Sequence, residues 1–175
     1  MAQLDLTPPL GDEAAVAALE ILSLHQLAAA ADAVRARHHG NEVRYRNAEG
    51  AEGAGDAGEP GVAAFTWSTD DAAETRLAAL RHALARPGIT AIRLEREDGG
   101  VSGSGIDDLT TVAWARLVVP GEIHLIAPWA GFGGKLGQVA LEFGVDDLGT
   151  VSTGAEEGLR RWVTEAGRTP VRHDA

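Results

Sequence analysis

The sequence contains no cysteine among its 175 residues. Disulfides, thiolate catalysis, zinc–thiolate sites and iron–sulfur clusters all depend on cysteine sulfur, so this chain supplies none of them. Basic residues are also scarce, because 15 Lys and Arg stand against 26 Asp and Glu and the net charge is -11. Nucleic acids and anionic membrane surfaces attract clustered positive charge, so we expect neither as a partner.

Long apolar runs are absent as well. No stretch of the sequence approaches the roughly 20 apolar residues of a membrane helix. The first residues also lack the basic and apolar segments of a secretion signal, so we expect a cytoplasmic protein. Hydrophobic residues still make up 45% of the chain, which is enough for a folded core, and the length suits a single domain.

The first third of the chain contains two kinds of segment. Residues 12–39 carry apolar side chains every three or four positions, which predicts N-terminal helices. His38 and His39 suit the negative end of the helix dipole, and a short strand is predicted at residues 43–46. Residues 48–61 are rich in Gly, Ala and acidic side chains, and this composition is typical of a flexible linker.

Strands and helices alternate from residue 62 to the end of the chain. The predicted strands are 62–67, 90–95, 123–128 and 147–151, with helices of about 10–15 residues between them. Such alternation predicts βαβ units and a parallel sheet. A closed barrel of eight units normally needs about 200 residues or more. We therefore expect an α/β fold with about four or five parallel strands, either a small open sheet or a partial (β/α) barrel.

Three stretches carry a family resemblance. The first is "LAAAADAVRARHHGNEVRYRN", and the second runs from "ETRLAALRHAL" to "GSGIDDLTTVAWARLVV". The third is "EIHLIAPWAGFGGKLGQVALEFGVDDLGTV", with "EAGRTPVRHDA" behind it. In this order they resemble the radical SAM enzymes of the aminofutalosine synthase group, which includes dehypoxanthine futalosine cyclase and the radical SAM components of deazaflavin (FO) synthesis. The resemblance implies a parent barrel and a place in menaquinone or deazaflavin biosynthesis.

The chain departs from that family where the family's chemistry begins. In those enzymes a Cys-x₃-Cys-x₂-Cys motif follows the first strand, whereas here the predicted linker 48–61 stands in place of the middle of the barrel. Without three thiolates a [4Fe–4S] cluster has no ligands, and SAM cannot be cleaved reductively. The resemblance therefore implies a truncated homologue, with late-barrel units over 62–175, that binds no cofactor.

Two pairs of adjacent acidic residues are candidate functional residues. Asp107 and Asp108 fall at a predicted helix start, where capping is the ordinary role, although the resemblance places them near the substrate side of the barrel. Asp146 and Asp147 follow a helix. Because neighbouring side chains of an extended segment point to opposite faces, we do not expect these two to act as a pair. The resemblance favours Asp147.

The strand at 123–128 and the glycine-rich turn behind it supply the other candidates. His124 shares one face of that strand with Ile126 and Pro128, and a histidine in a strand most often has a structural role. The catalytic candidates are Asp107, His124 and Asp147. The ligand-binding candidates are Asp108, Trp129, Gly131, Gly133, Lys135 and Asp146. No set of residues has metal-ligand spacing, so we predict no metal site.

Three functions remain open at this point. The first is a non-catalytic protein that binds a small molecule or a partner, the second a small acid–base enzyme, and the third a decayed homologue without a selected function. A partial barrel leaves unpaired sheet edges, and such edges recruit other strands. We therefore expect association with a second copy of the chain or with a full-length radical SAM relative.

Overall fold

The computed structural model describes residues 7–48, 59–97 and 105–173. Within these ranges the chain forms helices and strands in alternation after two N-terminal helices. In chain order the elements are α1 (Asp12–Ile21), α2 (Leu24–His39), β1 (Glu42–Asn47), β2 (Val62–Trp67), α3 (Ala73–Leu84), β3 (Ala91–Arg96), α4 (Gly105–Val118), β4 (His124–Ile126), α5 (Trp129–Ala140), η1 (Leu141–Phe143), β5 (Asp147–Val151), η2 (Thr153–Ala155), α6 (Glu156–Glu165) and β6 (Thr169–Arg172). The α/β class with an N-terminal helical segment is confirmed.

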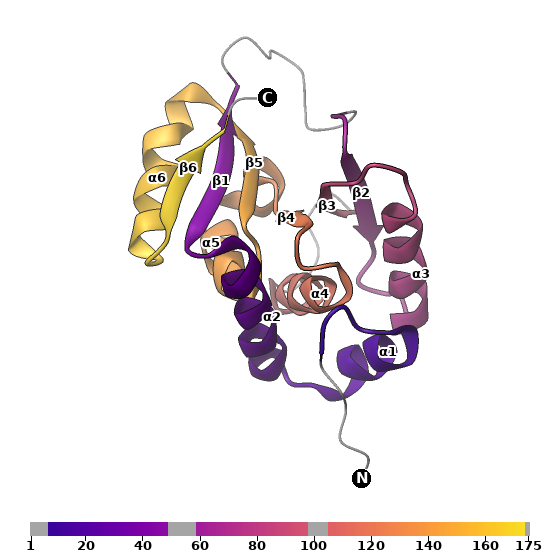
Figure 1. The fold of residues 1–175 in the computed structure, drawn as a ribbon. Helices are drawn as coiled ribbons and strands as arrows, with labels where there is room; N and C mark the ends of the chain where they lie inside the picture. The colour runs from indigo at the N-terminus through magenta and orange to yellow at the C-terminus, as the bar shows by residue number, and fades with distance from the viewer. Residues whose placement is uncertain (1–6, 49–58, 98–104, 174–175) are drawn as a thin grey trace.

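All the described strands lie parallel in one sheet, in the order β2-β3-β4-β5-β1-β6. β2 and β3 pair along their whole length. β4 is much shorter, and its registered pairing with β5 consists of Ile126 opposite Asp147. The sheet therefore has two wings, β2-β3 and β5-β1-β6, which are joined by the short β4 (Figure 1).

The last strand was not expected from the sequence. β6 pairs with β1, and the Thr169 amide donates to the Asn41 carbonyl at 2.9 Å while the His173 amide donates to the Tyr45 carbonyl at 3.0 Å. The described sheet thus has six strands rather than four or five, with β2 and β6 at its edges. Association of two chains across these edges stays a prediction.

The predicted linker falls mostly outside the described residues, which resume at residue 59. Its two ends are nevertheless tied to the fold. The Ala48 amide donates to the Val151 carbonyl at 2.9 Å, and Arg46 at the end of β1 forms an ion pair with Glu59, just ahead of β2. The chain therefore enters and leaves this segment at fixed points.

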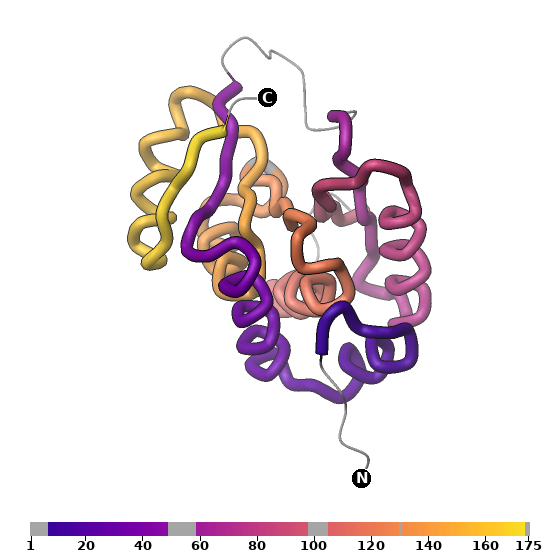
Figure 2. The backbone as a smooth tube through the Cα atoms, in the orientation of Figure 1, coloured from indigo at the N-terminus to yellow at the C-terminus, as the bar shows by residue number. Residues whose placement is uncertain are grey.

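The main hydrophobic core lies between the sheet and the helices. Side chains alternate along the strands, so that Leu94 and Leu125 enter this core, whereas Val62, Ala91 and Ile126 form a small second cluster on the other face. The N-terminal helices complete the core, because α2 packs alongside α4 (Figure 2). The buried Trp114 of α4 anchors α1 by donating its indole N–H to the Ala15 carbonyl at 2.8 Å.

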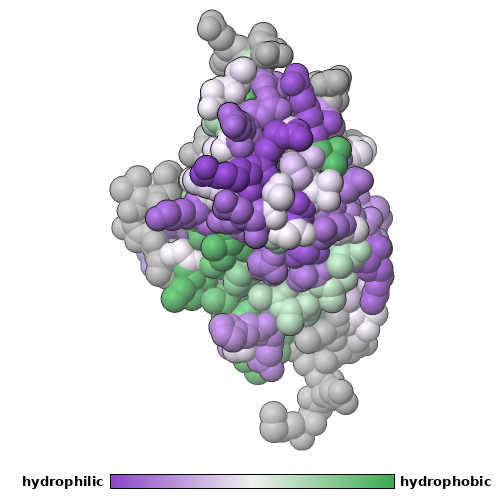
Figure 3. Space-filling model, turned by 90° about the vertical axis from the view of Figure 1, so that its left-hand side faces the viewer, coloured by the Kyte–Doolittle hydropathy of each residue, from purple (hydrophilic) through white to green (hydrophobic). Residues whose placement is uncertain are grey.

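The outer surface is mixed in character. Seen from the side of α6, hydrophilic side chains cover most of the upper surface, and hydrophobic side chains gather below them (Figure 3). Val139 of α5 is 44% exposed, and its neighbours Phe132, Leu136 and Phe143 are half-buried. Of the helices in the described ranges, none has both the length and the apolar character that a bilayer span requires.

Candidate functional site

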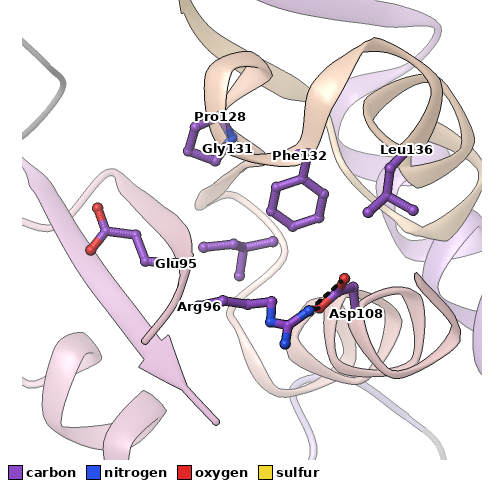
Figure 4. A pocket seen from close by; sticks show the side chains of 8 residues that line it. Glu95, Arg96, Asp108, Pro128, Gly131, Phe132 and Leu136 are labelled. Carbon is purple, nitrogen blue, oxygen red and sulfur yellow. Dashed lines mark hydrogen bonds and ion pairs between the residues drawn. The ribbon is translucent and has the colours of Figure 1, made fainter. Parts of the chain in front are cut away.

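A pocket of about 280 Å³ opens at the carboxyl edge of the sheet, between the end of β3, the first turn of α4 and the start of α5 (Figure 4). Its lining residues are Leu94, Glu95, Arg96, Asp108, Pro128, Gly131, Phe132 and Leu136. In open α/β sheets, ligands bind beyond the carboxyl ends of the strands. The position of the pocket therefore makes it the leading candidate site.

One wall of the pocket is apolar. Phe132 and Leu136 project from α5, and both are half-buried. They belong to different segments of α5, because Gly133 between them has φ 71° and ψ 159° and breaks the helical path. That φ value lies in the region that side-chain-bearing residues rarely adopt. The glycine thus lets the chain turn between the two apolar side chains.

The polar part of the pocket is an ion pair. Arg96 at the end of β3 lies 3.3 Å from Asp108 in the first turn of α4, and their side chains are 6% and 7% exposed. Glu95 is more open to solvent and pairs with Arg93 at 2.6 Å. Hydrogen-bond donors of a guanidinium and acceptors of a carboxylate therefore stand beside an apolar wall, an arrangement typical of small-molecule sites.

Two of the residues selected from the sequence lie in this pocket, namely Asp108 and Gly131. Asp107 points elsewhere, because its carboxylate lies 3.2 Å from Arg76 of α3. Arg76 also donates to the Thr111 hydroxyl at 2.6 Å and to the Ser68 carbonyl at 3.1 Å. Asp107 thus joins α3 to α4 in the first turn of a helix that already begins at Gly105.

The other candidates on α5 lie outside the pocket lining. Trp129 packs against Trp162 of α6, with ring centroids 5.0 Å apart. Gly133 and Lys135 are exposed. The glycine-rich turn therefore shapes α5 and its contact with α6, and it contributes Gly131 alone from the predicted ligand-binding glycines.

His124 and Asp146 meet at the opposite, amino edge of the sheet. The His124 imidazole hydrogen-bonds to the Asp146 carboxylate, which also accepts from Arg116 at 2.5 Å. Asp147 faces different groups, with Arg44 at 3.7 Å and His173 at 3.5 Å. The three catalytic candidates, Asp107, His124 and Asp147, therefore contact three separate sets of partners.

Burial and charge act against each other on Asp146. Burial alone would raise the pKa of its carboxyl, but the hydrogen bond from His124 and the positive charge of Arg116 outweigh that effect and hold the pKa below its ordinary value. Asp146 is thus a carboxylate in the folded protein. Asp146 is held in place by its hydrogen bonds with Arg116 and His124, and it does not line the carboxyl-edge pocket.

Sequence reasoning missed most of the pocket. Leu94, Arg96, Phe132 and Leu136 were not among the candidates. A usable signal was present for two of them, because the apolar Phe132 and Leu136 come just after a predicted strand end, although Gly133 breaks the helix between them and they do not share one helix face. Arg96 gave no such signal, because it is paired with a residue twelve positions away.

No family model matches the sequence. Two curated proteins align with parts of it, and both bear the name 5-amino-6-(D-ribitylamino)uracil--L-tyrosine 4-hydroxyphenyl transferase. The protein from Archaeoglobus fulgidus is 39% identical over 87 residues, covering 41% of this chain and 25% of its own length. The protein from Methanothermobacter thermautotrophicus is 36% identical over 110 residues, covering 54% of this chain and 26% of its own length. The chain thus spans about a quarter of each relative.

These matches correct the family assignment made from the sequence. The aminofutalosine synthase group, with dehypoxanthine futalosine cyclase and a role in menaquinone synthesis, was the wrong assignment, because the relatives carry the uracil and tyrosine transferase name instead. They do fit the FO synthase part of the original resemblance. Parts of the chain are thus distantly similar to FO synthase-related radical SAM enzymes.

Proposed function

We propose that this chain is a non-catalytic binding protein that holds a small ring-shaped molecule in the carboxyl-edge pocket. The observation that carries the proposal is the joining of the Arg96–Asp108 ion pair to the apolar wall of Phe132 and Leu136 at this edge. An aromatic side chain stabilises a stacked ring, and the ion pair supplies polar groups that orient it.

The absence of cysteine is the reason for proposing binding without radical SAM chemistry. A [4Fe–4S] cluster of the radical SAM type is held by cysteine thiolates, and this chain has none to offer. Within the pocket, Arg96 and Asp108 are engaged with each other. The pocket therefore favours recognition of a molecule over its conversion.

The relatives' names suggest which molecule to test. They contain 5-amino-6-(D-ribitylamino)uracil and L-tyrosine. A uracil edge presents both carbonyl acceptors and N–H donors, and these complement the guanidinium and carboxylate of an Arg–Asp pair. We therefore expect the ribitylaminouracil to bind more tightly than L-tyrosine.

Isothermal titration calorimetry with each compound tests the proposal. We expect Phe132→Ala to weaken binding of the ribitylaminouracil about tenfold, because it removes the aromatic surface against which a ring would stack. Val139→Ala is the matched control, since Val139 lies on the same helix, is 44% exposed and does not line the pocket.

Two results would overturn the proposal. One is the absence of heat of binding for both compounds with the unmodified chain. The other is an equal loss of affinity in Phe132→Ala and Val139→Ala, because that would locate the effect in α5 as a whole rather than in the pocket.

A further inference from the structure

Three side chains from distant parts of the sequence converge at the amino edge of the sheet. His39 ends α2, His124 begins β4 and Asp146 immediately precedes β5. Each offers a ligand atom, and these atoms lie within 4.8 Å of one another. The two imidazole centroids are 4.6 Å apart, and His39 Nδ1 is 3.7 Å from Asp146 Oδ2. We call this set the amino-edge triad.

The carboxylate of the triad is held in a fixed orientation. Asp146 Oδ1 accepts hydrogen bonds from Arg116 at 2.5 Å and from the Leu125 amide at 2.9 Å. Its other oxygen, Oδ2, faces the imidazoles of His39 and His124. Metal-binding carboxylates are commonly oriented by such outer hydrogen bonds. One oxygen is thus committed to the protein and the other is directed at the two histidines.

The His39 ring has an unexplained buried atom. Its side chain is 9% exposed, and no described group meets hydrogen-bond geometry at Nε2, with the Gly121 backbone as the polar group beside the ring. A buried polar atom without a partner costs about 1–3 kcal/mol, so such an atom calls for an explanation.

The surroundings contain charges of both signs. A pocket of about 390 Å³ opens beside the triad, and Glu42 and Glu122 line it as exposed carboxylates. The positive charges of Arg44 and Arg116 disfavour binding of a cation there. Arg116 is offset by Asp146, and Arg44 lies 3.7 Å from the carboxylate of Asp147. The pocket gives access from solvent and room for a water molecule as a further ligand.

We propose that the amino-edge triad of His39, His124 and Asp146 binds one Zn²⁺ ion. Two imidazoles and one carboxylate are a typical zinc ligand set, with a water completing four-coordination, whereas Mg²⁺ and Ca²⁺ prefer all-oxygen sites. This replaces the expectation that the chain has no metal site. The ion would join the end of α2 to the starts of β4 and β5, so its binding should stabilise the fold.

Calorimetric titration with zinc chloride, paired with thermal unfolding, tests the inference. We expect one ion per chain, and at a hundredfold excess over the dissociation constant we expect the melting temperature to rise by roughly 5–10 °C. Co²⁺ should bind competitively and give the visible absorption of a tetrahedral site. A chelator should reverse both effects.

Variants locate the site. His39→Ala and His124→Ala should each lower zinc affinity at least tenfold, while His25→Ala, an exposed histidine at the start of α2, should leave it unchanged. Circular dichroism without zinc verifies that each variant is folded. If one of the two histidine variants does not fold, the other still tests the site. The inference fails if the unmodified chain takes up no zinc. It also fails if His25→Ala lowers affinity as much as His39→Ala or His124→Ala.

Discussion

The amino edge and the carboxyl edge of the sheet, where the parallel strands begin and end, differ in the contacts that their side chains make. At the amino edge, His124, Arg116 and Asp146 are locked together by short hydrogen bonds, and Arg116 and Asp146 are almost fully buried. At the carboxyl edge, one ion pair lies beside an apolar wall that opens to solvent. The amino edge consists of side chains of this chain that contact one another, and the ligand proposed for it is a metal ion, whereas the carboxyl edge keeps an apolar surface available for an organic ligand.

This difference indicates that the amino edge mainly stabilises the fold and that the carboxyl edge mainly binds a ligand. In (β/α) folds the amino face supports stability, and the carboxyl face carries function on its loops. The same division accounts for the positions of the predicted residues, since His124 and Asp146 have chemically versatile side chains but stand at the stabilising edge. Substitutions at the two edges should therefore differ in kind, with loss of stability and of the proposed zinc binding at the amino edge and loss of small-molecule binding at the carboxyl edge.

The largest expected effect comes from breaking the amino edge at Arg116. Its guanidinium donates to the Gly144 and Ile123 carbonyls, each at 2.9 Å, and to Asp146. Arg116→Met keeps the side-chain length but leaves the Asp146 carboxylate buried without its main counter-charge. We expect the free energy of unfolding, measured in urea, to fall by about 3–5 kcal/mol.

Two further variants sharpen this test. Arg161→Met replaces an arginine that is 68% exposed, and it should change the free energy of unfolding by less than about 0.5 kcal/mol. Adding Asp146→Asn to Arg116→Met should recover part of the loss, because position 146 then no longer holds a buried carboxylate without its counter-charge. A loss below about 1 kcal/mol for Arg116→Met would contradict the stabilising role of this edge.

Much of the fold could be predicted from the sequence because its signals are local. Alternating and three-to-four-residue periodicities predicted the strands from β1 to β5 and most helices, and Ser23 forms the capping box of α2. β6 was missed because Thr169–Arg172 is short, polar and contains a proline. It is a strand through its pairing with β1, a contact across more than 120 residues.

The candidate site was harder to predict because, like the pairing of β6 with β1, it depends on contacts between residues far apart in the sequence. Asp108 and Gly131 were selected, but their partners Arg96 and Phe132 come from other elements. At the amino edge, His39 was assigned to the helix dipole, and its approach to Asp146 depends on the packing of α2 against α4 and η1. The sequence shows which residues have chemically reactive side chains, but it does not show which of them lie together in the folded chain.

A smaller effect is expected at the carboxyl edge, where α5 meets α6. A Cβ atom added at Gly134 would lie 1.4 Å from the Trp162 ring. The ring packs on Trp129, so it cannot move without loss of contact. We expect Gly134→Ala to lower the free energy of unfolding by about 1–3 kcal/mol, measured in urea.

The same clash provides its own control. In a chain that already carries Trp162→Ala, adding Gly134→Ala should cost little, so the two substitutions should be non-additive by about 1 kcal/mol or more. Additive losses would show that Trp162 is not the cause. Gly158→Ala, where an added Cβ meets no atom within 4 Å, should instead stabilise α6 by about 0.5–1 kcal/mol.

The smallest expected effect concerns a solvent-facing carboxylate at the carboxyl edge. Glu156 at the start of α6 accepts hydrogen bonds from the Tyr45 hydroxyl at 2.8 Å and from the Asn47 amide. These bonds, the Tyr45 one above all, hold the pKa of Glu156 below its usual value of 4.5. A depressed carboxyl pKa contributes stability above the unfolded value, and this is lost as the pH falls through the folded value. Glu156→Gln should therefore lower the urea midpoint slightly at about pH 7, and the difference from the unmodified chain should shrink as the pH falls below 4.5. A midpoint difference that persists unchanged at the lower pH would assign the effect to side-chain packing and not to the charge, in contrast to the buried carboxylate of the amino edge.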